Sequence, residues 1–333
     1  MADSKKPRGV IDTTPVHKVE NTELSPQIGS YVHQRYVKAA TSDNTRRAYQ
    51  SAIRHFGQWG GALPTTQSTV MNYLLAHAQT LSTRTLALRL TALKNWHKLQ
   101  GFNDPVTDEV KILLKGIERK EGRPKEKAAT FTLKDLTRMV QCIDKESDLK
   151  ALRDKALILI GFWGAFRRSE LVGITAENIK VVEEGVVITV PRSKTDQEGA
   201  GLKKPLQTLN NLLCPVTALN TWMYESGIEQ GEVFRGINRW ELLKDNGLTA
   251  TSVNLILKDR ARKAGLEEAP NLSAHSLRRS LATTVYKAGG SFSSIKRQGN
   301  WTNDATVWGY IEEAKLFEDN VMNMFTSDVL PSK

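Results

Sequence analysis

The chain has 333 residues, more than one compact domain usually holds, so two domains of roughly 100 to 200 residues are expected. Its 47 Lys and Arg against 36 Asp and Glu give a formal charge of +11, which is typical of a protein that binds a polyanion, although an acidic membrane would also suit this charge. No apolar run reaches the roughly 18 residues of a membrane span, so no membrane association is expected. With 2 cysteines and no apolar leader, a disulfide framework is excluded and a reducing, cytoplasmic location is expected.

The first part of the chain predicts a tail followed by a helical domain. Residues 1–25 mix charges of both signs with few large apolar groups, and we expect a flexible tail there. Residues 26–117 show apolar side chains at helical spacing, which predicts four or five short helices. One helix is expected to start at Asn44 or Thr45, and another after Ser82.

Basic residues lie on the polar faces of these predicted helices. Such a face can lie along the phosphate backbone of a nucleic acid, although a solvated helix face has the same composition. The candidates for contacts with DNA in this domain are Arg46, Arg47, Arg84, Arg89 and Lys94.

A charged stretch with Gly122, Pro124 and few apolar groups predicts a linker at residues 118–130. A sequence close to a helix-capping box follows at Thr132, where the second domain, residues 131–333, is expected to begin.

The second domain is expected to be helical as far as about Glu177. Short strands are predicted at residues 179–182 and 186–190, followed by a polar turn over residues 192–201 that leads to a further strand. Helices are predicted again from about Pro215 onward. The pattern is mainly helical with a small amount of strand.

An arginine pair, Arg167 and Arg168, occurs at the end of an otherwise apolar helical stretch. Burial of a guanidinium is costly unless an anion meets it. Glu170 could be that anion in a structural ion pair, or the arginine could meet an anionic ligand. The spacing to Glu170 favours Arg167 as the residue that faces a site.

Other candidates lie further along the chain. His275 and Arg278 are three residues apart and share one helix face, so they can address one ligand together. Taken singly, Trp301 and Tyr310 could be core residues and Lys194 a solvated turn residue. Taken together, these groups supply the positive donors, the nucleophile and the acid that phosphoryl transfer requires.

In this order the residues resemble the active site of the tyrosine site-specific recombinases, the lambda-integrase class, and most closely its Cre-like branch. Local strings carry the resemblance: residues 166–171 are similar to the family's first arginine box, residues 193–195 to its hairpin lysine, and residues 300–303 precede the tyrosine at Cre-like spacing. The flanking Phe166 and Arg168 depart from the family's usual residues.

The resemblance implies a mainly α fold with a small antiparallel β-sheet in the catalytic domain, and a two-domain, C-shaped clamp around DNA. It implies that strands are cut and rejoined through a 3′-phosphotyrosyl intermediate, without cofactor, metal or ATP. Its implied roles are the nucleophile for Tyr310, contacts with the phosphate for Arg167, His275, Arg278 and Trp301, a general acid at Lys194, and an orienting carboxylate at Glu170.

The implied partners are double-stranded DNA with inverted repeats and three further copies of the chain, in the bacterial cytoplasm or nucleoid. An apolar stripe at Phe317, Val321, Met324 and Phe325 either folds back on its own domain or docks into a neighbouring subunit, and the second arrangement is the one we expect. Candidates for reading bases are the basic residues of one predicted helix: Lys258, Arg260, Arg262 and Lys263.

Other functions stay open at this point. A type IB topoisomerase would use the same kinds of residue to relax DNA as a monomer, and a non-catalytic DNA-binding regulator could keep the fold. Metal-dependent nuclease chemistry would require convergent carboxylates, and the sequence shows no such cluster.

Overall fold

The computed structural model describes residues 41–124, 127–191, 201–315 and 322. The chain divides into two compact units, Met1–Lys125 and Glu126–Lys333, each with its own apolar core. No described helix is both long enough and apolar enough to cross a membrane.

The described part of the first unit is helical. Its elements are α2 (Asp43–Trp59), α3 (Gln67–His77), α4 (Thr83–Gln100) and α5 (Asp108–Glu121). The Ser82 side chain caps α4 as predicted, by accepting a hydrogen bond from the Thr85 N–H. Helix α2 begins at Asp43, just before the predicted start, because Ser42 is its cap. Helix α5 continues to Glu121, past the predicted beginning of the linker at residue 118.

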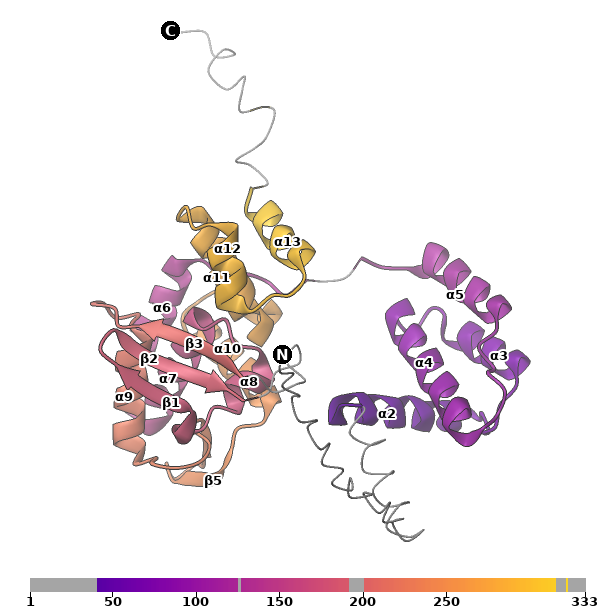
Figure 1. The fold of residues 1–333 in the computed structure, drawn as a ribbon, viewed down its shortest axis with the longest axis horizontal. Coiled ribbons are helices and arrows are strands. Elements are labelled where there is room, and N and C mark those ends of the chain that lie inside the picture. Colours follow the sequence, from indigo (N-terminus) through magenta and orange to yellow (C-terminus); the bar gives the residue numbers. More distant parts are fainter. Residues whose placement is uncertain (1–40, 125–126, 192–200, 316–321, 323–333) are drawn as a thin grey trace, which may run out of the picture. The chain divides into compact units, whose positions relative to one another are not determined.

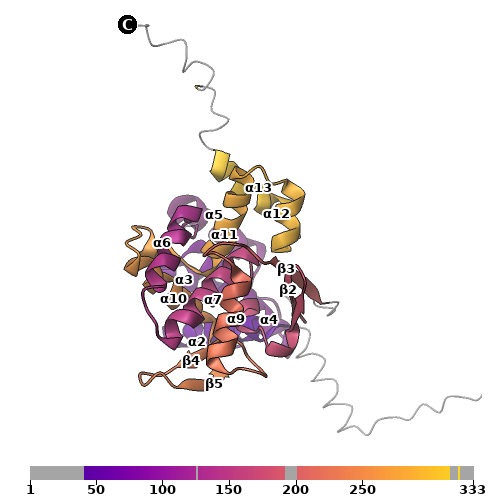
Figure 2. The ribbon, with the colours of Figure 1, turned by 90° about the vertical axis from the view of Figure 1, so that its left-hand side faces the viewer.

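The second unit contains helices and two small sheets (Figures 1 and 2). Its elements are α6 (Leu133–Ile143), α7 (Leu149–Trp163), α8 (Arg168–Val172), the 3₁₀ turn Ala176–Asn178, β1 (Ile179–Val182), β2 (Gly185–Val190), β3 (Leu202–Gln207), α9 (Pro215–Ser226), β4 (Arg235–Ile237), β5 (Leu243–Gly247), α10 (Ala250–Lys263), the 3₁₀ turn Ala269–Asn271, α11 (Ala274–Lys287), α12 (Phe292–Gly299) and α13 (Asp304–Lys315). The predicted fold class, mainly α with a small antiparallel sheet, is confirmed.

The predicted capping box at Thr132 is confirmed, since the Thr132 and Asp135 side chains each bond the other residue's backbone N–H. The prediction of one helical stretch as far as Glu177 is wrong in detail. Asp148 caps a new helix, α7, and a turn at Gly164 separates α7 from α8. The turn at Gly164 is important for the site because it places Arg167 at the beginning of α8.

The β4–β5 hairpin corrects the expectation of helices throughout from Pro215 onward. Its two strands are antiparallel and pair Ile237 with Leu243, and the Leu248 N–H extends the pairing to the Phe234 carbonyl. Strands of three and five residues are too short to display a periodicity that distinguishes them from a helix.

Helix α7 lies at the centre of the second unit and contacts α6, α9 and α11. Residues 156–162 of α7 are all buried, as expected of a helix that is covered on every side. Helix α11 in turn contacts α12 and α13, and the three-stranded sheet has the order β1-β2-β3 with Ile188 opposite Lys204. Helix α11 therefore links the central α7 to α12 and α13, and α7 also contacts α8.

Candidate active site

Tyr310 and His275 are in contact although they lie on different helices. Tyr310 Oη is 3.0 Å from His275 Nε2, and the two helices that carry these residues, α13 and α11, pack against each other. His275 is exposed, whereas Tyr310 is only 8% exposed. A phenol beside an imidazole at this distance has a partner that can take up its proton.

Arg278 lies one turn further along α11 and is buried, with 3% exposure. Its Nη2 donates to the Gly299 carbonyl at 2.8 Å, its Nη1 donates to the Ala165 carbonyl, and its guanidinium carbon lies 4.7 Å from the centre of the Trp301 ring. Burial, with the nearby charge of Arg167, lowers its pKa to about 10. The guanidinium is therefore still charged at neutral pH.

The turn after α12 places Trp301 against the nucleophile candidate. The rings of Trp301 and Tyr310 meet edge to face, with centroids 5.8 Å apart. The turn depends on Asn300, which has the positive φ of 48° that asparagine tolerates, and on Gly299, where an added Cβ would lie 1.9 Å from the Trp301 ring. The local sequence thus positions the indole.

Arg167 is fixed by Glu170 at the beginning of α8. The Glu170 carboxylate accepts hydrogen bonds from the Arg167 backbone N–H at 2.9 Å and from Arg167 Nη1 at 2.6 Å. The Glu170 side chain is 3% exposed and that of Arg167 22% exposed. The arginine therefore reaches the surface while the carboxylate stays beneath it.

A cavity of 330 Å³ opens beside Arg167, His275 and Arg278. It is lined by Arg167, Arg168, Asn254, Ser273, Ala274, His275 and Arg278. A cavity with three arginines and a histidine on its wall suits an anion such as a phosphate.

One buried residue close to this site was not singled out by the sequence analysis. Lys204, on β3, is 2% exposed, and its Nζ donates to the carbonyls of Gly164 at 2.6 Å and Gln298 at 2.8 Å. The strand pattern contained a signal for it, because the period of two places Lys204 on the same inward face as Leu206.

Two parts of the predicted machinery lie outside the described residues. These are Lys194, and the apolar stripe of Phe317, Val321, Met324 and Phe325. Among the residues that the structure does describe, no group of three or more His, Cys, Asp or Glu is placed to hold a metal ion.

The basic candidates of the first unit differ in their surroundings. Arg47 and Arg84 are exposed, whereas Arg46 pairs with Asp43 and Lys94 pairs with Asp104 at 2.9 Å. Arg89 is partly buried, and its Nη1 donates to Tyr73 Oη at 2.6 Å and bonds His55 Nδ1 at 2.5 Å.

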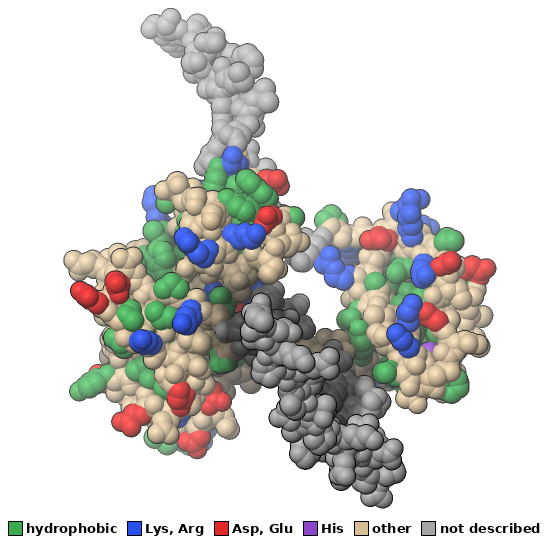
Figure 3. Space-filling model, in the orientation of Figure 1, with side chains coloured by type: hydrophobic (Ala, Val, Ile, Leu, Met, Phe, Trp, Pro, Cys, Tyr) green, Lys and Arg blue, Asp and Glu red, His purple; other side chains and the backbone are tan. Residues whose placement is uncertain are grey.

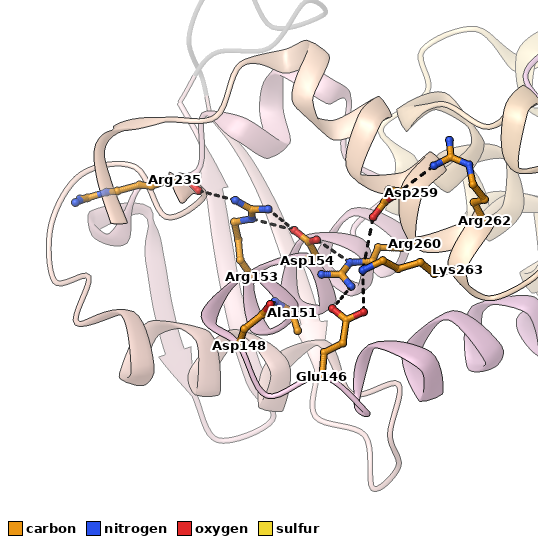
Figure 4. Close-up of polar contacts among 10 residues, drawn as sticks. All are labelled: Glu146, Asp148, Ala151, Arg153, Asp154, Arg235, Asp259, Arg260, Arg262 and Lys263. Carbon is orange, nitrogen blue, oxygen red and sulfur yellow. Dashed lines mark hydrogen bonds and ion pairs between the residues drawn. The ribbon is translucent and has the colours of Figure 1, made fainter. Parts of the chain in front are cut away.

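The prediction that Arg260 reads bases is wrong. Arg260 is 1% exposed, and its guanidinium pairs with Asp154 at 2.7 Å and with Glu146 at 2.5 Å (Figure 4). A buried carboxylate needs such a partner, so Arg260 belongs to the core and not to a DNA surface. Its neighbours Arg262 and Lys263 are exposed and pair with Asp259 and Glu146.

Lys258 lies on a different face of α10, beside the active site. With Thr251, Asn254 and Leu255 it lines a groove of 980 Å³, and this groove shares Asn254 and Ser273 with the smaller cavity. Elsewhere, on the face seen in Figure 3, Lys and Arg side chains are scattered over both units and form no single patch. The groove next to the active site is therefore the better-defined candidate surface.

The fold and the cluster of tyrosine, histidine and arginines are those of a tyrosine recombinase. Residues 129–316 match the phage integrase family, and the chain belongs to this family. It is 33% identical over 316 residues to an integrase/recombinase XerD homologue of Selenomonas ruminantium, with 92% of this chain and 91% of that protein covered. The resemblance that the motifs predicted is confirmed.

More distant matches include another recombinase and two integrases. The Cre recombinase of Escherichia phage P1 is 24% identical over 300 residues, covering 82% of this chain and 85% of Cre. Among solved structures, the Tn1549 transposon integrase with transposon right-end DNA has a TM-score of 0.59 at 16% identity, with 86% and 97% of the two chains covered. A lambda integrase dimer bound to a core site has a TM-score of 0.58 at 16% identity, with 85% and 94% covered. These structural likenesses show the fold.

Proposed function

We propose that this tyrosine recombinase cuts and rejoins double-stranded DNA at a specific site through a covalent bond between Tyr310 and a 3′-phosphate. The observation that carries the proposal is the 3.0 Å contact between Tyr310 Oη and His275 Nε2 beside the buried Arg278. This contact supports the proposal because the candidate nucleophile, a group that could hold its proton and a candidate phosphate-binding cation lie close together.

In the proposed reaction the Tyr310 oxygen attacks the phosphorus, the oxygen–phosphorus bond forms, and the bond to the 5′-oxygen breaks. His275 takes up the phenolic proton, and Lys194 gives a proton to the departing 5′-oxygen. Arg278 and Arg167 hold the two non-bridging oxygens, where negative charge is concentrated. Because the phosphodiester energy is kept in the new bond, rejoining requires neither ATP nor a metal ion.

We infer that four copies act on two sites with inverted repeats through a Holliday junction, held together by the C-terminal stripe, in the bacterial cytoplasm or nucleoid. The groove beside Lys258 would face the DNA. The DNA-bound relatives support DNA as the partner.

The test is capture of the covalent intermediate. The full-length protein is incubated in EDTA with a library of DNA fragments from its own genome, denatured in detergent, and examined for protein that stays attached to DNA. We expect adducts with the wild type and none with Tyr310→Phe, which keeps the ring and loses only the attacking oxygen. Tyr286→Phe is the matched control, because this partly buried tyrosine of α11 lies outside the reacting cluster.

Each alternative has its own outcome. Adducts that persist in Tyr310→Phe would assign the nucleophile elsewhere. Binding of DNA without any adduct would favour a non-catalytic regulator. Relaxation of supercoiled plasmid by a monomer, without strand exchange between two sites, would favour activity of the type IB topoisomerase kind.

A further inference from the structure

One buried ammonium group holds two carbonyl groups beneath the active site. Lys204 Nζ lies 2.6 Å from the Gly164 oxygen and 2.8 Å from the Gln298 oxygen. Gly164 belongs to the turn that leads into Arg167, and Gln298 lies in the last turn of α12, just before Trp301. A single side chain thus joins two segments that are far apart in sequence and that each carry a residue of the site.

Arg278 joins the same two segments one residue further along each of them. Its Nη1 donates to the Ala165 carbonyl and its Nη2 to the Gly299 carbonyl. The two turns are therefore held by two cations side by side. Arg278, the proposed phosphate ligand, has five N–H donors, so its two bonds to carbonyls leave N–H groups available for the substrate.

The surroundings of Lys204 indicate that its bonds matter. Its neighbour on the strand, Lys203, is exposed, whereas Lys204 is 2% exposed and its Nζ lies 5.1 Å from the centre of the Phe166 ring. Burial, together with the charge of Arg278, lowers the pKa of Lys204 to about 7. An apolar side chain would fill this position at lower cost, so the two carbonyl contacts are the feature that a lysine adds.

The position of Lys204 on β3 gives a further reason to expect that this residue matters for the site. β3 begins at Leu202, immediately after the segment that contains Lys194, and pairs with β2 along its whole length. Lys204 therefore also attaches the paired strands β2 and β3 to the two turns.

We propose that Lys204 is a positioning residue of the active site. By joining the Gly164 and Gln298 carbonyls it fixes the spacing of the turns that carry Arg167 and Trp301. Its effect on catalysis rests on the proposed function, whereas its effect on the two turns does not.

The first experiment needs no DNA. Backbone hydrogen exchange is measured by mass spectrometry at pH 7 on full-length wild type, Lys204→Met, Lys204→Arg and the matched control Lys203→Met. In Lys204→Met we expect exchange to be about tenfold faster or more in peptides over residues 161–170 and 296–303, because two buried acceptors lose their donor. Lys204→Arg should restore part of the protection, and Lys203→Met should match the wild type. Unchanged exchange in either turn of Lys204→Met would overturn the proposal.

The second experiment measures the rate of the covalent adduct on a duplex captured by the wild type. Lys204→Met should react up to about 100-fold more slowly, the effect of a small misplacement of catalytic groups, while its affinity for that duplex stays within about twofold. A Lys204→Met rate equal to that of Lys203→Met would reject the positioning role.

The proposal can still be tested if Lys204→Met does not fold or if the wild type forms no adduct. If Lys204→Met does not fold, Lys204→Gln, which keeps a donor without the charge, is measured in the same way. If the wild type forms no adduct with any DNA, the proposed function fails, and the exchange experiment alone decides whether Lys204 holds the turns.

Discussion

At the scale of single residues, two buried cations lie at and beneath the candidate active site. Arg278 and Lys204 are 3% and 2% exposed, and both have a lowered pKa for the same first reason, burial. Their protein partners are mainly backbone carbonyls, which accept hydrogen bonds without neutralising the charge. Arg278 therefore keeps its positive charge at neutral pH, whereas Lys204 with its pKa of about 7 is only about half protonated there.

The lowered pKa of Lys204 predicts how stability depends on pH. Because the folded pKa of about 7 lies below the ordinary 10.5, the folded state binds fewer protons than the unfolded state between these values. The free energy of unfolding of the wild type should therefore rise with pH across this window relative to Lys204→Met, by on the order of 5 kcal/mol, and should be flat below it.

Chemical unfolding at several pH values measures this difference. The subtraction of Lys204→Met cancels the titration of other groups, and the charges that face the amine, Arg278, Glu170 and Arg167, are present in both proteins. A difference that does not change with pH would mean that the amine titrates normally.

At the scale of elements, one helix can serve the core and the surface with residues of the same type. The basic residues of α10 are Lys258, Arg260, Arg262 and Lys263, and only Arg260 points into the buried ion-pair network with Asp154. Lys258 faces the groove beside the active site. These residues are alike in composition, and only their positions around the helix distinguish the buried Arg260 from Lys258 in the groove.

Substitutions in α10 should therefore have opposite effects. Arg260→Met should lower the free energy of unfolding by about 1 to 3 kcal/mol, because Oδ2 of the buried Asp154 carboxylate loses its partner while Arg153 still holds Oδ1. Lys258→Ala should change stability by less than about 0.5 kcal/mol and weaken binding to DNA. Denaturant unfolding and DNA titration at fixed salt measure both. Loss of DNA affinity in a fully stable Arg260→Met protein would contradict this division.

At the scale of the whole molecule, the chain has two separate cores. The core of the first unit is built from helices α2 to α5, and that of the second is built around α7. Because each core buries its own apolar side chains, each unit can lose its structure without the other.

Calorimetry on the full-length chain should show this independence. Leu74→Ala should lower the stability of the first unit by about 2 to 5 kcal/mol and leave the transition of the second unit in place. Leu157→Ala is the matched substitution, since both leucines are fully buried, and it should shift only the other transition. A single transition that moves with either substitution would contradict independent unfolding.

The sequence predicted those features that depend on neighbouring residues. The cap at Ser82 and the capping box at Thr132 were predicted because a helix start is a local pattern. The small β4–β5 hairpin was missed, since its pairing joins two segments that are each too short to show a pattern. Among the site residues, the order Arg167, His275, Arg278 was visible in the sequence, but the burial of Lys204 was not singled out.

The sequence by itself determined the family and the chemical inventory, because both depend on which residues occur and in what order. Only the tertiary structure decided that Tyr310 meets His275, that Arg260 is part of the core, and that Lys204 joins two distant turns. The physical reason is the same in each case. Burial and hydrogen bonding depend on segments far away in the chain, and these come together only when the helices pack.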